Sequence, residues 1–435
     1  MEISKNNSGI RNGIAFLSFI LIVYSFCSCK KSELLFPDTG IRILKVFDDT
    51  TASAENPSLK IAAGNNQLFM VYGNGAPSIL VGGAIFTLDH RAKIISTDLN
   101  GSLLWQHELE YNLDIGDVVA LQDGGCILAA YDYWGTTDHD QQHIYLSRFD
   151  AGGNRTLSDS ITLPASLSTN YFLYPVGCCR AVNGNIILFG TIYDANDPVN
   201  STKPYVGEYN LSGGWNWVKW YKFLPNASNE STSITSGVAT NDGYLFTAIA
   251  NEYAPGSSSI ALIFKTNFSG DSSWSMKQQA TKDAWVGNSA VSYNGEIYFA
   301  YSLGDDGSSQ NDIDYTGYIS HLDANGVLLN SITVHAQSDN YITSISASGN
   351  GSVFALSNKF GNTLFSYGDP IFTGNQTHYT RTGATLNRTG QGLLQTETND
   401  LFPVACKLPD GRTACFGLLQ TKSRTYYKPA LMILE

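Results

Sequence analysis

Short apolar runs and tight polar turns alternate along most of the chain at a regular spacing. Seven times, an apolar run leads into a two-residue turn and a second apolar run follows, and these turns are Asn65-Asn66, Asp123-Gly124, Asn183-Gly184, Asp242-Gly243, Asn294-Gly295, Asn350-Gly351 and Asp410-Gly411. The second residues of successive turns lie 58, 60, 59, 52, 56 and 60 positions apart. Asn-Gly and Asp-Gly favour β-hairpins, because a type I′ turn needs positive φ at both central residues. The pattern predicts one hairpin unit repeated seven times.

A second, weaker signal follows six of these hairpins: another apolar strand that runs into a turn containing Gly, as in residues 92–109 and 144–161. The runs after the first turns are almost continuously apolar, for example residues 126–132 (CILAAYD), as expected of strands buried on both faces. Each unit therefore has four strands, and a four-stranded repeat of this length is typical of a propeller blade. The sequence predicts an all-β fold, a seven-bladed β-propeller with four-stranded antiparallel blades.

The seventh unit lacks its fourth strand, because after Asp410-Gly411 the chain has only two more β-rich runs before Glu435. Residues 37–49 resemble the missing segment, since Gly40 is followed by a β-rich run. We expect this N-terminal strand to complete the last blade, which would leave no open sheet edge between the first and last blades. The predicted organisation is a signal peptide over residues 1–28, a tether over 29–36 and the propeller over 37–435.

The N-terminus has the pattern of an export signal. Lys5 and Arg11 precede an apolar run of about 13 residues, 14–26, which suits a signal peptide and is short for a membrane-spanning helix. The run ends in Cys27-Ser28-Cys29 followed by lysines, which resembles a bacterial lipoprotein signal of the Bacteroidetes type. The resemblance implies cleavage before Cys29 and its acylation, for example with palmitate, so that several acyl chains anchor the protein to a membrane. We expect the cell envelope, on the outer membrane; a simple secretory signal or an uncleaved anchor is the alternative.

Composition narrows the possible partners. The formal net charge is −12, and charged residues make up 15% of the chain. Nucleic-acid binding needs a basic surface that neutralises phosphates, so the acidic balance argues against a nucleic-acid partner. The sequence contains no Gly-x-Ser-x-Gly elbow, Walker loop, dinucleotide fingerprint or His-Glu-x-x-His motif.

Residues 97–109 (TDLNGSLLWQHEL) place Asp98 and Gly101 in a turn before a strand that carries Trp105, and Trp217 and Trp274 have comparable positions. This arrangement resembles the repeat of quinoprotein-like (PQQ-type) propellers. The resemblance implies the propeller architecture, and packing of Trp between blades explains it fully. A quinoprotein dehydrogenase would also need a cofactor floor and a calcium site, and we expect neither a cofactor nor a metal here.

Two cysteine pairs invite comment. Cys178 and Cys179 are adjacent on one strand, so their side chains should face opposite packed sheets as small apolar groups. Counting outward from the Asp410-Gly411 turn places Cys406 opposite Cys415, with Cβ atoms about 4.5–5.5 Å apart. A cross-strand disulfide between Cys406 and Cys415 is therefore a hypothesis, with two free thiols as the alternative.

The long connections on one face should carry whatever function exists, because binding residues concentrate on variable loops of a rigid scaffold. The candidate binding-face residues come from loops 133–143, 304–315 and 359–378, and they are Trp134, Asp138, His139, Asp140, His143, Asp305, Asp306, Asp312, Asp314 and Tyr367. Their spacing matches neither a zinc motif nor an EF-hand loop, so we interpret these loops as solvated. No catalytic residue can be chosen from the sequence.

Two functions remain open at this stage. The anchor, the aromatic and acidic loops and the absence of a catalytic motif favour a non-catalytic binding or scaffold lipoprotein that engages a protein or a glycan. The alternative is a carbohydrate-active enzyme, a hydrolase or lyase, with acidic residues at the propeller axis. Carboxylates that converge with a His or Tyr in a deep axial pocket would favour the enzyme.

Overall fold

The computed structural model contains an all-β unit that begins at Ile41. The described residues are 41–48, 59–74, 78–81, 84–87, 91–109, 113–132, 143–165, 171–173, 177–194, 202–224, 230–252, 258–291, 295–306, 313–338, 340–348, 351–359, 363–366, 369–372, 376–383, 385–394, 401–420 and 427–435. None of them belongs to a helix long and apolar enough to cross a membrane. The predicted residues Cys29, Trp134, Asp138, His139, Asp140, Asp312 and Tyr367 lie outside this set.

Seven antiparallel sheets are built one after another along the chain. Blade 1 has the strands β2 (Lys60–Ala63), β3 (Gln67–Asn74), β6 (Arg91–Asp98) and β7 (Leu103–Glu108). Blade 2 has β8 (Leu113–Ala120), β9 (Cys126–Asp132), β10 (Ile144–Phe149) and β11 (Arg155–Ile161). Blade 3 has β12 (Tyr171–Leu173) and β13 (Gly177–Arg180), which both pair with β14 (Ile186–Asp194), followed by β15 (Thr202–Tyr209) and β16 (Trp215–Trp220).

The remaining four blades repeat the arrangement. Blade 4 has β17 (Glu230–Thr240), β18 (Gly243–Glu252), β19 (Ile260–Thr266) and β20 (Ser272–Gln279). Blade 5 has β21 (Asp283–Val291), β22 (Ile297–Asp306), β23 (Ile313–Leu322) and β24 (Leu328–Ser338). Blade 6 has β25 (Asn340–Ala347), β26 (Val353–Lys359), β29 (Gln376–Thr382) and β30 (Arg388–Leu394). Blade 7 has β31 (Leu401–Lys407), β32 (Thr413–Gln420), β33 (Tyr427–Leu434) and β1 (Ile41–Val46).

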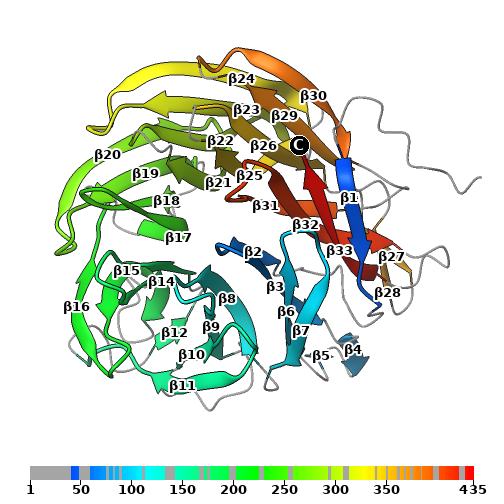
Figure 1. Cartoon of the computed structure of the whole chain (residues 1–435). Helices are drawn as coiled ribbons and strands as arrows, with labels where there is room; N and C mark the ends of the chain where they lie inside the picture. Colours follow the sequence, from blue (N-terminus) through cyan, green and yellow to red (C-terminus); the bar gives the residue numbers. More distant parts are fainter. Residues whose placement is uncertain are drawn as a thin grey trace, which may run out of the picture. The chain divides into compact units, whose positions relative to one another are not determined.

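The first strand of each blade is its innermost strand. The inner strands β8, β13, β17, β21, β25, β31 and β2 contact one another in ring order, and β31 of the last blade touches β2 of the first. Figure 1 shows the ring viewed along its axis. The predicted seven-bladed propeller is confirmed.

The N-terminal strand closes the ring, as predicted. β1 pairs antiparallel with β33, with Leu44 opposite Met432 and Val46 opposite Ala430. The Phe47 N–H extends this ladder by donating to the Pro429 carbonyl at 2.9 Å. Without β1, strand β33 would present an unpaired edge, so one sheet holds together residues from both ends of the propeller.

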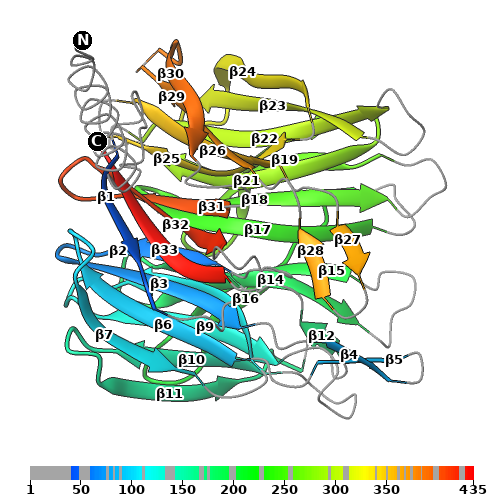
Figure 2. The same cartoon turned by 90° about the vertical axis from the view of Figure 1, so that its right-hand side faces the viewer.

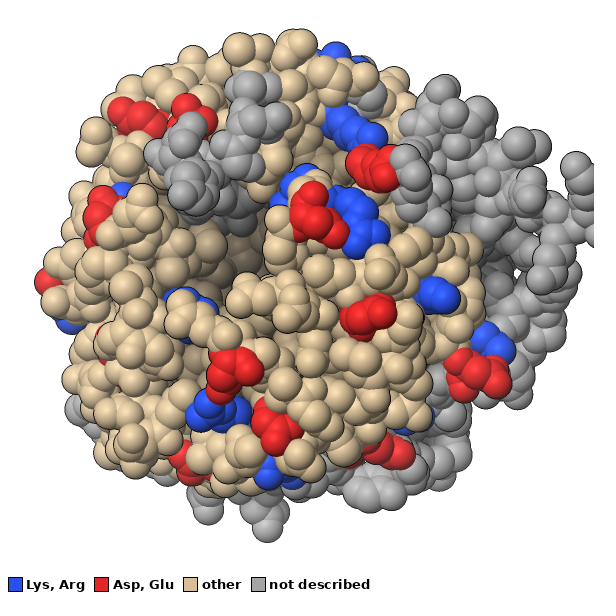
Figure 3. Space-filling model, in the orientation of Figure 1, with Lys and Arg blue, Asp and Glu red and all other residues tan. Residues whose placement is uncertain are grey.

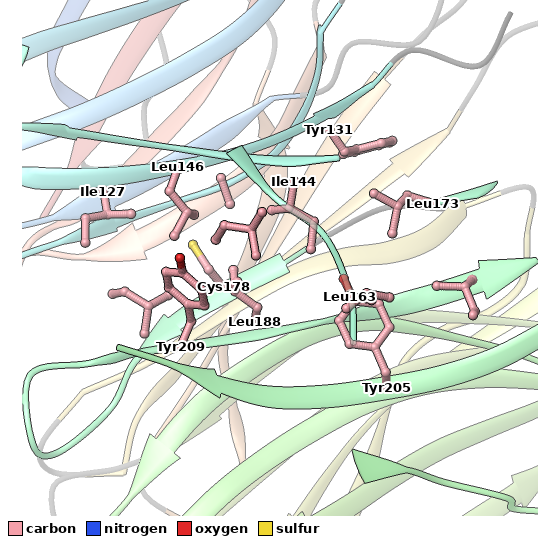
Figure 4. Close-up of a cluster of buried hydrophobic side chains, with 14 of the residues drawn as sticks. Ile127, Tyr131, Ile144, Leu146, Leu163, Leu173, Cys178, Leu188, Tyr205 and Tyr209 are labelled. Carbon is pink, nitrogen blue, oxygen red and sulfur yellow. The ribbon is translucent and has the colours of Figure 1, made fainter. Parts of the chain in front are cut away.

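The buried apolar side chains of the described residues form seven clusters, and each cluster lies between two neighbouring blades. Figure 4 shows the cluster between blades 2 and 3, where Ile127 and Leu146 face Leu188 and Tyr209. Fully burying such a side chain contributes about 1.5–3 kcal/mol. Because every middle strand packs on both faces, the near-continuous apolar runs of the sequence are explained.

The adjacent cysteines follow the expected alternation. Cys178 belongs to the cluster with blade 2, and Cys179 belongs to the cluster with blade 4. Both thiols are free and buried. Burial raises the pKa of both, so they behave as small apolar groups rather than as nucleophiles.

The turn geometry corrects the sequence prediction. At Leu408 the N–H donates to the Arg412 carbonyl at 2.8 Å, the Gly411 N–H donates to the Leu408 carbonyl at 3.0 Å, and Gly411 has φ 92°. The turns at Leu121, Ala181 and Ser348 have the same pair of bonds. This is a type I turn followed by a glycine bulge, not the predicted type I′ turn, since positive φ is needed at only one position.

The extra bulge residue also shifts the strand register by one. Cys406 pairs with Ala414 and Cys415 pairs with Ala405, so the predicted direct opposition of the two cysteines is wrong. Because side chains alternate between faces of a sheet, this shift separates the two thiols, and both are free. Burial raises the pKa of Cys406 to about 12.

Two long connections contain short hairpins of their own. Residues 73–91 contain the short hairpin β4 (Ser78–Val81) with β5 (Ala84–Thr87). Residues 359–378 contain β27 (Thr363–Ser366) with β28 (Asp369–Phe372). Each hairpin joins the second and third strands of its blade.

Candidate functional site

The propeller has two different faces. One carries the tight turns between the first and second and between the third and fourth strands of each blade, and we call it the short-turn face. The other carries the longer connections, including β4–β5 and β27–β28, and we call it the loop face; Figure 2 shows the two faces at the left and right. Each inner strand starts at the loop face, so the first residues of β21 and β25 lie there.

Three aromatic rings meet at the loop-face end of blades 5 and 6. The ring centroids of Trp285 and Tyr341 are 4.3 Å apart with an interplanar angle of 45°. Tyr315 meets Tyr341 edge-on, with centroids 5.8 Å apart. Trp285 is 37% exposed although it lies on an innermost strand. We call Trp285, Tyr341, Tyr315 and the adjacent Asp283 the aromatic platform.

Asp283 holds the platform in place. Its carboxylate accepts hydrogen bonds from the Tyr315 hydroxyl at 2.8 Å, the Ser259 hydroxyl at 2.9 Å and the Ala284 N–H at 2.9 Å. Burial raises the pKa of Tyr315, and the bond to Asp283 raises it further, so the phenol stays a donor. With Tyr315 fixed, the three rings present a rigid apolar surface bordered by polar atoms.

The geometry of blade 5 explains how the platform forms. Ala284 and Val286 point into the cluster shared with blade 4. Asp283 and Trp285 alternate with them and therefore face blade 6, where Tyr341 is the second residue of β25. Gly304 lies opposite Asp283 on β22 and next to Tyr315 on β23, so no side chain separates the carboxylate from the phenol.

The predicted residues Asp305 and Asp314 lie close to the platform along the chain but on the other side of the sheet. They are directly opposite each other in the β22–β23 ladder. Their neighbour Leu303 packs against the cluster with blade 4, and side chains two positions apart share a face. Asp305 accepts a hydrogen bond from the Thr281 hydroxyl. Asp306 ends β22, opposite Ile313.

The predicted residue His143 lies in blade 2, away from the platform. Its N–H donates to Asp132 at 2.8 Å, and its ring Nδ1 lies 3.4 Å from the same carboxylate. The Tyr145 hydroxyl donates to the other oxygen of Asp132 at 2.9 Å. These contacts link Asp132 to His143 and Tyr145 across the ends of the loop and give His143 a structural role. His143 lies in blade 2 and is not part of the aromatic platform of blades 5 and 6.

Polar side chains also link one blade to the next near the axis. The Thr191 hydroxyl donates to the Thr232 carbonyl at 2.7 Å, and the Thr247 hydroxyl donates to the Gly287 carbonyl at 3.2 Å. Asp117, on the inner strand β8, accepts from the backbone of Cys178 in blade 3. Burial is the largest influence on Asp117 and raises its pKa, although the charge of Lys60 opposes this.

No cluster of three or more His, Cys, Asp or Glu side chains that could hold a metal ion occurs in the part of the chain that the structure describes. Asp117 is the only carboxylate among the linking side chains named above. Among the described residues, aromatic rings from blades 5 and 6 meet at the loop face.

Sequence reasoning missed Trp285 and Tyr341. The search for function was confined to loops, and these two residues lie within the first residues of inner strands. The available signal was their position: an aromatic residue two or three places into an inner strand is at the loop face and at the blade boundary.

The chain matches no family model and no curated protein sequence. Its fold is similar to that of an ulvan lyase of polysaccharide lyase family PL25, with 8% identity over 90% of this chain and 94% of that chain and a TM-score of 0.52. A weaker likeness is to an α-L-arabinanase of Penicillium chrysogenum, with 10% identity over 91% and 98% of the chains and a TM-score of 0.44. A Bacteroides caccae protein of unknown function has 10% identity over 79% and 98%, with a TM-score of 0.37. At such identities the likeness shows the fold alone.

Proposed function

We propose that this chain is a non-catalytic, glycan-binding lipoprotein of the bacterial cell envelope, with the aromatic platform as its binding site. The observation that supports this most directly is Trp285, which is 37% exposed and packs at 4.3 Å on Tyr341. A partly exposed Trp on the innermost strand of a propeller exposes apolar area that folding does not require. Exposed aromatic area of this kind indicates an interaction site.

The chemistry of the platform suits a sugar. The C–H-rich face of a pyranose is apolar and packs on an aromatic ring, while its hydroxyls need polar partners nearby. Ligand sites combine aromatic walls with a few fixed polar groups in this way. Tyr315, held by Asp283 at 2.8 Å, supplies a rigid polar edge beside the rings. A rigid site also loses less conformational entropy when it binds.

The membrane anchor in this proposal is supported by the sequence. The apolar run before Cys29 has the length of a signal peptide, and the Cys-Lys-Lys segment resembles lipoprotein cleavage sites. Acylation of Cys29 would hold the propeller at the envelope, where extracellular glycans are available. Mass spectrometry of the N-terminal peptide from the native host tests this part by itself.

The binding site is tested with a panel of soluble polysaccharides and isothermal titration calorimetry. Trp285→Ala should weaken binding of any glycan in the panel about ten-fold or more, because it removes a central aromatic contact. Trp274→Ala is the matched control, since Trp274 lies on the outermost strand β20 of blade 4 and packs on Gly326. Equal affinities of the Trp285→Ala variant and the parent chain would contradict the proposal.

A carbohydrate-active enzyme is the second candidate, and Asp117 is the observation that favours it. Burial raises the pKa of this carboxyl on an inner strand, which is the property of a general acid. The fold neighbours named above include a polysaccharide lyase and an arabinanase. If polysaccharide chains shorten in the presence of the full chain and Asp117→Asn abolishes this, the enzyme replaces the binding protein as the better account.

A further inference from the structure

The exposed apolar side chains of the propeller are unevenly distributed. Among the described residues, nine large apolar side chains are exposed. Seven of the nine lie in a tight turn of the short-turn face or within two residues of its end, and these are Leu103, Leu104, Val182, Phe268, Val327, Leu328 and Leu329. They come from four different blades. Repeated exposure of apolar groups on one side of a molecule indicates a contact surface.

The chain enters the propeller from the same side. Ile41, the first residue of β1, pairs with Leu434 at the short-turn end of β33. β1 then runs toward the loop face, and Figure 2 shows β1 and the C-terminus together at the short-turn side. Cys29 precedes Ile41 by twelve residues, which span at most about 40 Å even when fully extended. A lipid on Cys29 would therefore attach the propeller through its short-turn face.

Three basic side chains on this face are paired with opposite charges, although Lys407 lies near the like charge of Arg381. Arg148 pairs with Asp123 at 2.5 Å, and Arg412 pairs with Asp410 at 2.6 Å. Lys265 pairs with Asp242 at 2.6 Å. Figure 3 shows red and blue side chains lying next to each other on a surface that is mostly uncharged. Attraction to anionic lipid headgroups needs a basic patch, so any contact with a bilayer here is apolar.

We propose that the short-turn face rests on the lipid bilayer, with the seven exposed apolar residues in contact with the lipid interface. This inference rests on the lipid anchor of the proposed function but not on glycan binding. It orients the molecule: the loop face and the aromatic platform point away from the membrane, toward soluble or surface glycans. The acyl chains hold the propeller near the bilayer, and the apolar side chains determine which face meets it.

The orientation is tested on full-length, acylated protein in vesicles of brominated lipid. An environment-sensitive fluorophore is attached at Phe268→Cys on the short-turn face or, as the matched control, at Asp305→Cys on the loop face. Four of the native cysteines in the propeller are buried and Cys406 is half-buried, so unmutated protein measures the background labelling. We expect the label at 268 to be quenched several-fold more strongly than the label at 305.

A second variant separates apolar contact from the tether. Leu328→Ser with Leu329→Ser should reduce quenching at position 268 and leave the thermal melting temperature unchanged, because both side chains are exposed. Quenching should be the same in zwitterionic and anionic vesicles. Equal quenching at 268 and 305, or an unacylated Cys29, would overturn the proposal. So would a detergent-solubilised dimer that shields position 268, because the face would then bind a second copy. The glycan-binding proposal is tested separately, because these quenching measurements do not depend on glycan affinity.

Discussion

The two faces of this propeller differ in how their residues are held. On the short-turn face, one turn design recurs in most of the described turns: paired backbone hydrogen bonds close the turn, and a glycine has positive φ, as at Gly124, Gly184 and Gly411. On the loop face, connections differ in length, and the aromatic platform occurs at one blade boundary. The repeated turns of the short-turn face stabilise the fold, whereas the candidate site lies where the loop face departs from the repeat. Substitutions on the short-turn face should therefore lower the free energy of unfolding, and substitutions in the aromatic platform should mainly lower the affinity for glycan.

Turn chemistry shows this regularity at Asp98, Asp150, Asn267 and Asp323. Each of these side chains accepts backbone N–H groups two and four residues later, as Asp98 does from Asn100 at 2.9 Å and from Ser102 at 2.8 Å. In blades 2, 4 and 5 a Trp of the preceding blade then covers the turn glycine. The recurring Trp is thus a packing device between blades, as the sequence suggested.

The largest effect on stability is expected at Glu208 in blade 3. Its carboxylate accepts hydrogen bonds from the side-chain amides of Asn183 at 2.7 Å and Asn216 at 2.8 Å and from the Trp217 indole at 3.1 Å. Glu208→Ala leaves these donors without their acceptor and should cost about 2–4 kcal/mol of unfolding free energy. Urea denaturation measures this, with Asp305→Ala on the loop face as the control. If Glu208→Ala and Asp305→Ala lost the same unfolding free energy, the short-turn face would not be the more stabilising of the two faces.

The second largest loss of stability is expected when the turn glycines are replaced. A Cβ at Gly326, which has φ +81°, would lie 2.6 Å from the Trp274 ring, whereas a Cβ at Gly184, with φ +88°, would meet nothing within 4 Å. Gly184→Ala should cost about 1 kcal/mol from backbone strain alone, and Gly326→Ala at least about 1 kcal/mol more. Equal melting temperatures of the two variants would show that packing of the Trp274 ring on Gly326 does not contribute to stability.

Acid should lower the free energy of unfolding through Glu208 on the short-turn face. Burial tends to raise the pKa of Glu208, but its hydrogen bonds outweigh burial and lower the pKa below the usual value of 4.5. The stabilising contribution is therefore complete above about pH 4.5 and is lost as the pH falls through the folded pKa. Urea melts from pH 7 to pH 3 should show a steeper loss for the parent chain than for Glu208→Gln. Parallel curves would exclude Glu208 as a source of acid sensitivity.

The smallest effect on stability is expected at the platform itself. Trp285→Ala removes a ring that is 37% exposed, so it should cost less unfolding free energy than Glu208→Ala. Trp274→Ala should cost more, because it removes the indole hydrogen bond to the Ala324 carbonyl at 3.2 Å and the cover over Gly326. Thermal melts of the two variants, read beside their glycan affinities, complete the comparison. A larger loss at Trp285 would mean that the platform is part of the core.

The amino-acid pattern by itself determined the blade count, the four-stranded unit and the strand that closes the ring. Hairpin signals are local, and apolar runs such as residues 126–132 can be buried only between packed sheets. The opposite facing of Cys178 and Cys179 followed from strand alternation in the same way. The blade count, the four-stranded unit and the cysteine alternation depend on residues that are near one another in the chain, whereas the closing strand was identified as the strand missing from the last repeat.

Only the tertiary structure decided the turn type, the register and the candidate site. One bulged residue at Gly411 moved Cys406 away from Cys415, and no local rule chooses between a two-residue turn and a bulged one. The platform joins Trp285 on β21 to Tyr341 on β25 and Tyr315 on β23, which are separated along the chain. The contact between these rings depends on how blades 5 and 6 pack. Contacts between side chains of separate sheets do not produce a periodic pattern in the sequence, so they cannot be predicted from it.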